Sequence, residues 1–415
     1  MLEEIDPEVA ELVRRERARQ ESTINLIASE NYPSSATLEA QCNILVSKAV
    51  EGYPGKRYFG GCSFVDAVEN LAIDRAKKLF GAEHANVQCI TGTQANYAVY
   101  LAMLEVGDTV LAMDPIHGGH LSQGNPINLS GRIFSFIHYG VDPETERINY
   151  DTLSEIAERH QPKMIIAGGS ACPREIDFKA FRKVAEDVNA YFLVDMAHIA
   201  GLIVAGIHQD PIPHADFITS STHKTLRGPR GGGLILCRKK YAEKIDRAVF
   251  PGLQSAPLMY VIAGRAVLFK EAMSLSFRKY QKRTVENAKT LAEELMKRGF
   301  KLVTDGTDTH LMLLDLTNKG MSGRKAQSIL DSVGIVANKN TIPFDKRRPY
   351  YASGIRIGTP ALTTRGMKED EMREIAEMID LILNDPDDGD IKHKVGSQVK
   401  NLTDKFPLFS KEWQN

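Results

Sequence analysis

Apolar residues in the middle of the chain follow two spacings. Short runs in which nearly every residue is apolar are separated by longer stretches in which apolar residues recur every three or four positions. The short runs are residues 85–90, 109–113, 133–138, 164–167, 191–194, 217–219 and 233–237. A strand buried on both faces has this continuous apolar character, and the longer spacing is that of an amphipathic helix. The alternation predicts an α/β domain built on a mostly parallel, seven-stranded sheet.

The two ends of the chain have different patterns. Helical spacing predicts helices at 7–20, 34–50 and 65–79, with Gly81 ending the third, and a long helical stretch at 257–298. The C-terminal part mixes strand-like segments (301–304, 310–316 and 354–357) with helical ones (324–332 and 368–383). We therefore expect an N-terminal helical arm (1–50), a large α/β domain (51–280) and a smaller C-terminal α+β domain (281–415).

The overall charge of the chain is close to zero, at −1 for 415 residues. We therefore expect no nucleic-acid or membrane partner, although a local basic pocket could still hold a small anion. The five cysteines include no CxxC pair, so we expect neither disulfides nor a metal. The N-terminus is charged, and no apolar run approaches the roughly 20 residues that span a bilayer. These features predict a cytoplasmic protein.

Candidate chemistry follows the predicted strands, because ligands bind at the carboxyl ends of strands in an open α/β sheet. Thr91, Gly92 and Thr93 come after the first strand and open a helix. Backbone N–H groups and hydroxyls at a helix N-terminus can cradle a phosphate. An ordinary helix cap with a tight turn explains the same residues equally well.

Asp195 and Lys224 come after two successive predicted strands. A carboxylate at a strand end needs a cationic partner, and a protonated pyridine nitrogen would be one; capping of the next helix is the alternative. Lys224 is flanked by hydroxyls and a glycine-rich turn, and lysine can bind a carbonyl cofactor covalently, although most lysines lie on surface loops. Their separation of 29 residues, with one strand between them, favours a pyridoxal-phosphate site.

Two further residues are candidates for ligand contacts. Arg356 lies inside a short apolar strand, where a guanidinium needs a planar anionic partner. A substrate carboxylate and a structural Asp or Glu are equally good candidates for that partner. His120 follows a strand and could stack on a flat ring, although histidine is more often a structural residue.

Eight segments resemble serine hydroxymethyltransferase, in order and nearly end to end. They are 26–32 (LIASENY), 51–58 (EGYPGKRY), 117–121 (HGGHL), 194–198 (VDMAH), 222–230 (THKTLRGPR), 250–252 (FPG), 338–340 (NKN) and 354–360 (GIRIGTP). The resemblance implies a fold-type I pyridoxal-phosphate enzyme that cleaves serine reversibly to glycine and passes the one-carbon unit to tetrahydrofolate. It also implies a homodimer or tetramer whose active sites are shared between subunits.

The resemblance implies roles residue by residue. Lys224 would bind pyridoxal 5'-phosphate covalently, Asp195 would pair with its ring nitrogen, His120 would stack on its ring and His198 would lie beside its phenolic oxygen. Further cofactor-binding positions are Thr91, Gly92, Thr93, Ser170, His223, Ser255 and Ala256. The substrate-binding positions are Ser29, Glu51, Phe59 and Arg356. Glu51 would reach the site from the neighbouring subunit and would also move a proton during the reaction. Leu121 and Asn340 lie where the family contacts folate.

Several positions depart from the family pattern. Ala49 and Phe59 replace two tyrosines, Ser122-Gln123 replaces Thr-His, Ser255-Ala256 replaces Gly-Gly, Cys172 replaces tyrosine, and Pro115 replaces leucine. Residues 89–93 read CITGT where the family has Pro-His-Ser-Gly-Ser. In the family, the positions of Ala49, Phe59, Ser255 and Ala256 reach the site from the partner subunit. We expect the cofactor chemistry to be retained and the substrate-facing wall to be remodelled.

Three hypotheses remain open. The first is a folate-dependent serine hydroxymethyltransferase in which these changes are neutral drift. The second is a folate-independent aldolase or transaldolase acting on a β-hydroxy amino acid such as threonine, or a hydroxymethyl transfer to an α-methyl amino acid. The third is a catalytically silent homologue that binds a partner, which the joint presence of Lys224, Asp195 and Arg356 makes the weakest of the three.

Overall fold

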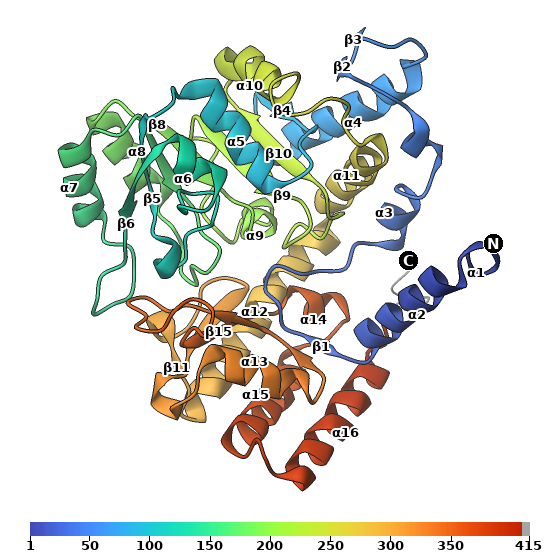
Figure 1. The fold of residues 1–415 in the computed structure, drawn as a ribbon, viewed down its shortest axis with the longest axis vertical. Helices are drawn as coiled ribbons and strands as arrows, with labels where there is room; N and C mark the ends of the chain where they lie inside the picture. Colours follow the sequence, from blue (N-terminus) through green and yellow to red (C-terminus); the bar gives the residue numbers. More distant parts are fainter. Residues whose placement is uncertain (409–415) are drawn as a thin grey trace. The chain divides into compact units, whose positions relative to one another are not determined.

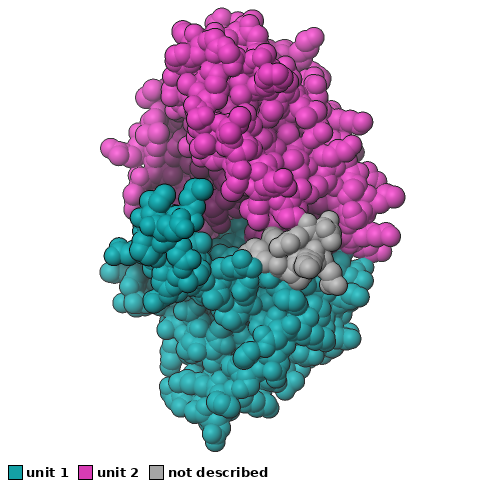
Figure 2. Space-filling model, turned by 90° about the vertical axis from the view of Figure 1, so that its right-hand side faces the viewer, with its two compact units in different colours: residues 1–30, 283–415 teal, residues 31–282 magenta. Residues whose placement is uncertain are grey.

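The computed structural model describes residues 1–408. The chain divides into two compact units, coloured separately in Figure 2. One unit is formed by Asn31–Lys282. The other joins Met1–Glu30 with the residues from Arg283 onward. The first 30 residues are therefore grouped with the C-terminal part, whereas the sequence predicts a separate arm over 1–50.

The unit formed by residues 31–282 is built on a seven-stranded sheet (Figure 1). Its strands, in spatial order, are β4 (His84–Asn86), β10 (Gly233–Cys237), β9 (Phe217–Ser221), β8 (Tyr191–Asp195), β7 (Met164–Ala167), β5 (Thr109–Met113) and β6 (Ser135–Tyr139). The strands from β9 to β6 pair in parallel, and β10 is antiparallel to both of its neighbours. The predicted α/β class and the mostly parallel sheet are confirmed.

Helices surround this sheet in the same unit. They are α3 (Ser35–Glu39), α4 (Ser63–Phe80), α5 (Gly92–Met103), α6 (Leu129–Ile133), α7 (Tyr150–His160), α8 (Phe178–Asp187), α9 (Ala200–Val204), α10 (Ala242–Val249) and α11 (Met259–Ala272), with one-turn helices η1 (Ile44–Ser47), η2 (Pro115–His117) and η3 (Lys239–Tyr241). A small hairpin, β2 (Gly52–Tyr53) and β3 (Lys56–Arg57), precedes α4. Helix α5 packs on β9, β10 and α10, and buried apolar side chains from these elements share one core.

Two predicted helices are shorter than the sequence pattern indicates. The predicted helix at 34–50 is interrupted after Glu39, because the Asn43 side chain accepts from the Leu45 N–H and donates to the Ala40 carbonyl. Such local bonds compete with the helical ladder. The stretch at 257–298 is divided into α11 and α12 (Leu275–Lys297), and the Ser274 hydroxyl accepts from the Phe277 N–H between them.

The other unit contains a four-stranded antiparallel sheet. The strand order is β11 (Lys301–Leu302), β12 (Leu311–Asp315), β15 (Gly354–Gly358) and β14 (Asn338–Asn340). A separate parallel pair joins β1 (Ile24–Asn25) to β13 (Ile335–Val336). The helices are α1 (Leu2–Ile5), α2 (Pro7–Glu21), α13 (Gly323–Asp331), α14 (Pro360–Thr364), α15 (Glu369–Asn384) and α16 (Gly389–Lys405), with η4 (Val303–Asp305) and η5 (Thr317–Lys319). The predicted C-terminal α+β pattern is confirmed.

The apolar core of this second unit explains why its segments group together. Ile24 and Leu26 of the N-terminal segment are buried in one cluster with Met312, Ile355 and Ile357 of the sheet. Each fully buried aliphatic side chain of this kind contributes about 1.5–3 kcal/mol. In the part of the chain that the structure describes, no helix combines the length and the apolar character needed to cross a membrane.

Candidate active site

The carboxyl ends of β8 and β9 place Asp195 and the Lys224 loop at the same edge of the sheet. The two strands are parallel neighbours, and Asp195 is in register with Thr219. Strand β9 ends at Ser221, three residues before Lys224. This edge is where an open α/β sheet binds its ligand. The structure therefore brings the two sequence-predicted residues to the same end of adjacent strands.

The Asp195 carboxylate is held by two hydrogen bonds. Asn96 Nδ2 donates to Asp195 Oδ2 over 2.9 Å, and the Ala197 N–H donates to Oδ1 over 3.1 Å. Asn96 lies on α5, is buried, and accepts a hydrogen bond from the Thr219 hydroxyl through its own Oδ1. The carboxylate is thus fixed from the neighbouring helix and from the backbone that follows it.

A second hydrogen bond from Asn96 links Asp195 to His120. The same Nδ2 donates to Ser122 Oγ over 2.9 Å, and Ser122 Oγ lies 2.7 Å from His120 Nδ1. The Ser122 N–H also donates to His120 Nδ1 over 3.2 Å, so this ring nitrogen is an acceptor. Ser122 therefore holds the orientation of the His120 ring through its hydroxyl and its N–H. The four residues Asp195, Asn96, Ser122 and His120 are called the Asp195 network below.

The Lys224 loop is anchored through its backbone. The Lys224 carbonyl accepts from Asn31 Nδ2 over 2.9 Å and from the Arg227 N–H over 3.0 Å. The Thr225 hydroxyl donates to the carbonyl of His198, which is itself buried. These bonds hold the residues on both sides of the lysine in place.

Two buried polar atoms near Lys224 have no hydrogen-bond partner among the described residues. They are Ser221 Oγ and His223 Nδ1. Burial lowers the pKa of His223 to about 3, with further lowering by the charges of Lys224 and Arg230. His223 is consequently neutral at physiological pH. Buried polar groups of this kind are normally satisfied, so they point to a ligand that supplies the missing partners.

The N-terminus of α5 lies against Ser221. A Cβ atom placed on Gly92 would be 3.5 Å from the Ser221 backbone nitrogen, so the first turn of the helix and the end of β9 are in contact. Thr91 caps this helix by accepting from the Gln94 N–H over 3.0 Å, and Thr93 follows in the first turn. The free N–H groups and the positive end of the helix dipole favour an anion here. Thr91, Gly92 and Thr93 thus serve as a cap and also fit a phosphate cradle.

Ser170, which follows β7, contacts the turn that precedes His120. Its N–H donates to the Gly118 carbonyl over 2.7 Å. Gly119 has no room for a side chain, because a Cβ atom there would approach the Met113 carbonyl oxygen to 2.1 Å. This turn positions both Ser170 and His120, and Leu121, the next residue, is 58% exposed.

A second group of sequence-predicted residues lies elsewhere in the same unit. Glu51 and Ser255 line one open hollow together with Tyr58, Phe250, Pro251, Gly252, Leu253 and Gln254. Asp195, His120 and Lys224 are not among the lining residues. Phe59 is 46% exposed, and its carbonyl accepts from the Cys62 thiol. Ala256 is partly buried beside Ser255.

The remaining predicted residues belong to the unit that contains β15. Arg356 is on this strand, and its Nε and Nη2 donate to Asn338 Oδ1 over 3.3 and 3.2 Å. Burial lowers the pKa of Arg356 to about 10. A guanidinium is suited to binding a planar anionic ligand. Asn340 on β14 is in register with Gly354.

The segment that carries Ser29 lies against the end of β15. The Gly358 N–H donates to the Leu26 carbonyl over 2.8 Å, and a Cβ atom on Gly358 would approach Ala28 to 2.8 Å. Glycine is therefore required where the two segments meet. This contact places Ser29 beside the strand that carries Arg356.

Sequence reasoning missed three residues that the structure adds to the site: Asn96, Ser122 and Ser221. Ser221 belongs to the hydroxyl-rich run before Lys224, which was a usable indication. Ser122 stood out only as a departure from the family pattern, and Asn96 offered no indication, because its contacts join segments distant in the chain.

Comparison with protein families identifies one match. Residues 2–379 match the family model described as "Serine hydroxymethyltransferase". The match includes every candidate residue named above and extends over parts of both units.

Proposed function

The chain belongs to the serine hydroxymethyltransferase family, and we propose on this premise that it transfers the hydroxymethyl group of serine to tetrahydrofolate, leaving glycine. Family membership implies serine hydroxymethyltransferase activity and makes the chain a pyridoxal-phosphate-dependent enzyme with amino-acid substrates. The observation that carries the proposal is the Asp195 network at the edge of the sheet that also holds the Lys224 loop.

The residues around Lys224 fit pyridoxal phosphate. Lys224 would hold the cofactor covalently, and the α5 N-terminus with Thr91, Gly92 and Thr93 would bind its phosphate. Ser221 Oγ and His223 Nδ1 are buried and have no other partner among residues 1–408, so they would contact the same ligand. A phosphate-bearing aromatic cofactor supplies both the anion and the polar atoms that this environment needs.

Asp195 would keep the ring nitrogen of the cofactor protonated. Its carboxylate is oriented by Asn96 and Ala197, so it is ready to accept from that N–H without rearrangement. When bound, pyridoxal phosphate supplies an electron sink for the electron pair released as the Cα–Cβ bond breaks. His120, whose ring is oriented by Ser122, would pack its flat face on the cofactor, while Ser170 and His198 would contact the polar edge of the cofactor.

Arg356 and Ser29 would bind the carboxylate of the amino acid. A guanidinium binds a carboxylate through two parallel hydrogen bonds, which fixes orientation as well as affinity. One of its acceptors, Asn338 Oδ1, is neutral and more than 3 Å away, and a carboxylate would make shorter, charge-assisted bonds than this one. Binding of this kind orients the bond to be cleaved relative to the ring.

Glu51 would move the proton during transfer, acting from the neighbouring subunit of a homodimer or tetramer. Glu51 and Ser255 share one open hollow that does not contain Asp195 or Lys224, which supports a role in the site of another copy. Ser255 would donate to the cofactor phosphate there, with Ala256 beside it, and Phe59 would contact the substrate. Leu121, which is exposed, and Asn340 on β14 would contact tetrahydrofolate.

A folate-independent reaction is the second candidate, and one feature favours it. Ala49 is exposed and has no hydroxyl, and Pro115 opens the one-turn helix η2 two residues before His117. Both replace larger side chains of the family pattern, which leaves more space for a substituent on the substrate. Threonine or an α-methyl amino acid would use such space.

A four-way assay of glycine release tests the proposal. Purified enzyme is given serine or threonine, each with and without tetrahydrofolate. The proposal predicts that release from serine requires tetrahydrofolate and exceeds release from threonine under that condition. Equal release from serine without tetrahydrofolate, or a clear preference for threonine, would support the aldolase instead.

A further inference from the structure

Arg57 binds the backbone on both sides of Glu51. Arg57 Nη1 donates to the Val50 carbonyl over 2.9 Å and to the Gly52 carbonyl over 2.6 Å, so it binds the residues on both sides of Glu51. The Glu51 carbonyl itself accepts from the Tyr58 N–H over 3.1 Å. All three carbonyls from residue 50 to residue 52 are therefore occupied by the return strand of the β2–β3 hairpin.

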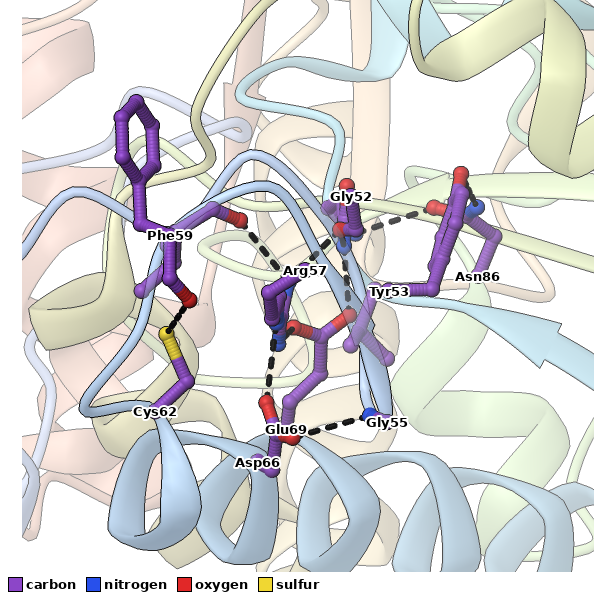
Figure 3. Close-up of polar contacts among 12 residues, drawn as sticks. Gly52, Tyr53, Gly55, Arg57, Phe59, Cys62, Asp66, Glu69 and Asn86 are labelled. Carbon is purple, nitrogen blue, oxygen red and sulfur yellow. Dashed lines mark hydrogen bonds and ion pairs between the residues drawn. The ribbon is translucent and has the colours of Figure 1, made fainter.

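Arg57 is held in turn by two carboxylates on α4. Its Nε donates to Asp66 Oδ1 over 2.8 Å, and its Nη2 donates to Glu69 Oε2 over 2.5 Å (Figure 3). The side chains of Arg57 and Glu69 are 3% and 0% exposed. Four of the five guanidinium hydrogens thus have acceptors in fixed directions, a geometry that lysine cannot reproduce.

Neutral donors complete the same framework. Gln88 Nε2 donates to Glu69 Oε1 over 2.7 Å and to the Gly52 carbonyl over 2.9 Å. Asp66 Oδ2 accepts from the Gly55 N–H over 2.8 Å, which ties the tip of the hairpin to α4. We call Arg57, Asp66, Glu69 and Gln88 the Arg57 clamp.

The backbone conformation at Gly52 also demands this arrangement. Gly52 has φ +96°, and a Cβ atom there would approach the Lys56 carbonyl oxygen to 2.4 Å. Any other residue would force the two strands apart. A buried ion pair is weak support for overall stability, because removing both charges from water is costly. The better explanation of the Arg57 clamp is that it specifies one local conformation.

We propose that Arg57 is a positioning residue for Glu51. By fixing the peptide groups before and after Glu51, Arg57 directs the Glu51 side chain into the hollow that Tyr58 and Ser255 also line. The inference rests on the proposed function, in which Glu51 moves the proton during hydroxymethyl transfer. Arg57 does not line the hollow, so its effect on catalysis passes through Glu51.

A double-mutant cycle tests this dependence. Arg57→Lys keeps the positive charge beside Glu69 but loses the fixed donor directions of the planar guanidinium. It should lower kcat on the order of 10²-fold, the size expected for a misplaced catalytic group. KM for serine should stay within about threefold, because Glu51 acts on the transfer step. In a Glu51→Gln background the same Arg57→Lys change should lower kcat by less than about twofold. A radiolabelled-serine assay keeps the slow variants measurable.

Hydrogen exchange supplies a readout that does not depend on activity. Amides of residues 50–58 should exchange about 10- to 100-fold faster in Arg57→Lys holoenzyme, because charge-assisted bonds are lost. Arg182→Lys is the matched control in the same unit. Arg182 also donates both to a backbone carbonyl (His214) and to a carboxylate (Asp216). This control variant should leave kcat and exchange at 50–58 unchanged.

The outcomes separate the two proposals. Wild-type enzyme that forms no glycine from serine would refute the proposed function, and the exchange data would then still test the clamp. If the wild-type enzyme is active and Arg57→Lys lowers kcat by the same factor with and without the Glu51→Gln change, the role through Glu51 is wrong. Unchanged hydrogen exchange at residues 50–58 would also overturn it. If Arg57→Lys does not fold, Asp66→Asn leaves a single acceptor oxygen for Arg57 Nε and the Gly55 N–H at the more exposed rim, and it should give a smaller loss with the same non-additivity.

Discussion

Asn96 Nδ2 lies 2.9 Å from Asp195 Oδ2 and makes its second hydrogen bond to Ser122 Oγ, also over 2.9 Å. One buried amide therefore sets the orientation of the carboxylate and, through Ser122, the orientation of the His120 ring. In the proposed site these two groups would act on the edge and on the face of the same ring. Asn96 thus connects the two groups in the proposed cofactor site.

Replacing Asn96 with Ala should impair both stability and cofactor binding. The change leaves Asp195 Oδ2 and the Thr219 hydroxyl without their partner, and an unsatisfied buried polar group costs about 1–3 kcal/mol. Urea denaturation and titration with pyridoxal phosphate would measure the two effects. Asn318→Ala, which removes an exposed amide bonded to the Gly299 carbonyl, is the control and should change neither. Wild-type affinity in Asn96→Ala would contradict the role of Asn96.

Ser122 should tolerate Thr but not Ala. Thr keeps the hydroxyl that accepts from Asn96 and donates to His120 Nδ1, whereas Ala removes it. Ser122→Ala should lower kcat by about tenfold, corresponding to one lost hydrogen bond of about 1 kcal/mol or somewhat more. Ser122→Thr should remain within about twofold of wild type, since the same bonds can form. Equal rates for the Ala and Thr variants would show that the hydroxyl is not needed.

The buried His223 should make stability fall in acid. Burial lowers the pKa of His223 to about 3 from the usual 6.5, so between these pH values the unfolded chain binds a proton that the folded chain does not. Stability then decreases as pH falls through this window, by about 1.4 kcal/mol per pH unit for one proton. His223→Gln should flatten the slope of unfolding free energy against pH, relative to wild type. His214→Gln, at another histidine of the same unit, is the comparison and should leave the slope as it is.

The main effect of Arg356→Lys should be a higher KM for serine, with a smaller effect on the free energy of unfolding. Loss of a two-point contact with a carboxylate costs about 1.5–3 kcal/mol, which corresponds to a 10- to 150-fold change in kcat/KM. Arg365→Lys is the control in the same unit, because Arg365 is also buried but donates to the backbone carbonyls of Thr23, Glu21 and Phe406. That variant should lower the unfolding midpoint and leave KM unchanged. The reverse pattern would mean that Arg356 is purely structural.

The sheet and the two central site residues were predictable from the sequence for a physical reason. Strands buried on both faces form continuous apolar runs, and consecutive parallel strands end at the same edge, so Asp195 and Lys224 could be expected near each other. The apolar spacing did not reveal that Asn43 interrupts a helix through its own side chain. Nor did it reveal that Ile133 ends α6 instead of opening β6.

Contacts between distant segments could not be predicted from local sequence patterns. The parallel pairing of Ile24 with Ile335 joins the N-terminal segment to the C-terminal part of the chain, and no spacing within 1–50 indicates it. The bonds from Asn96 to Ser122 and Asp195 span 26 and 99 residues. Motif resemblance supplied the chemically reactive groups, but the residues that hold them in place became visible only in three dimensions.

The most direct test of the proposed chemistry is to locate the cofactor on the chain. Borohydride treatment of the purified enzyme, followed by proteolysis and mass spectrometry, makes the bond between pyridoxal phosphate and its lysine permanent and identifies that lysine. The label should be found on the peptide that contains Lys224, and it should be lost in Lys224→Arg together with glycine formation from serine. Label on another lysine, or full activity in Lys224→Arg, would contradict the assignment of Lys224.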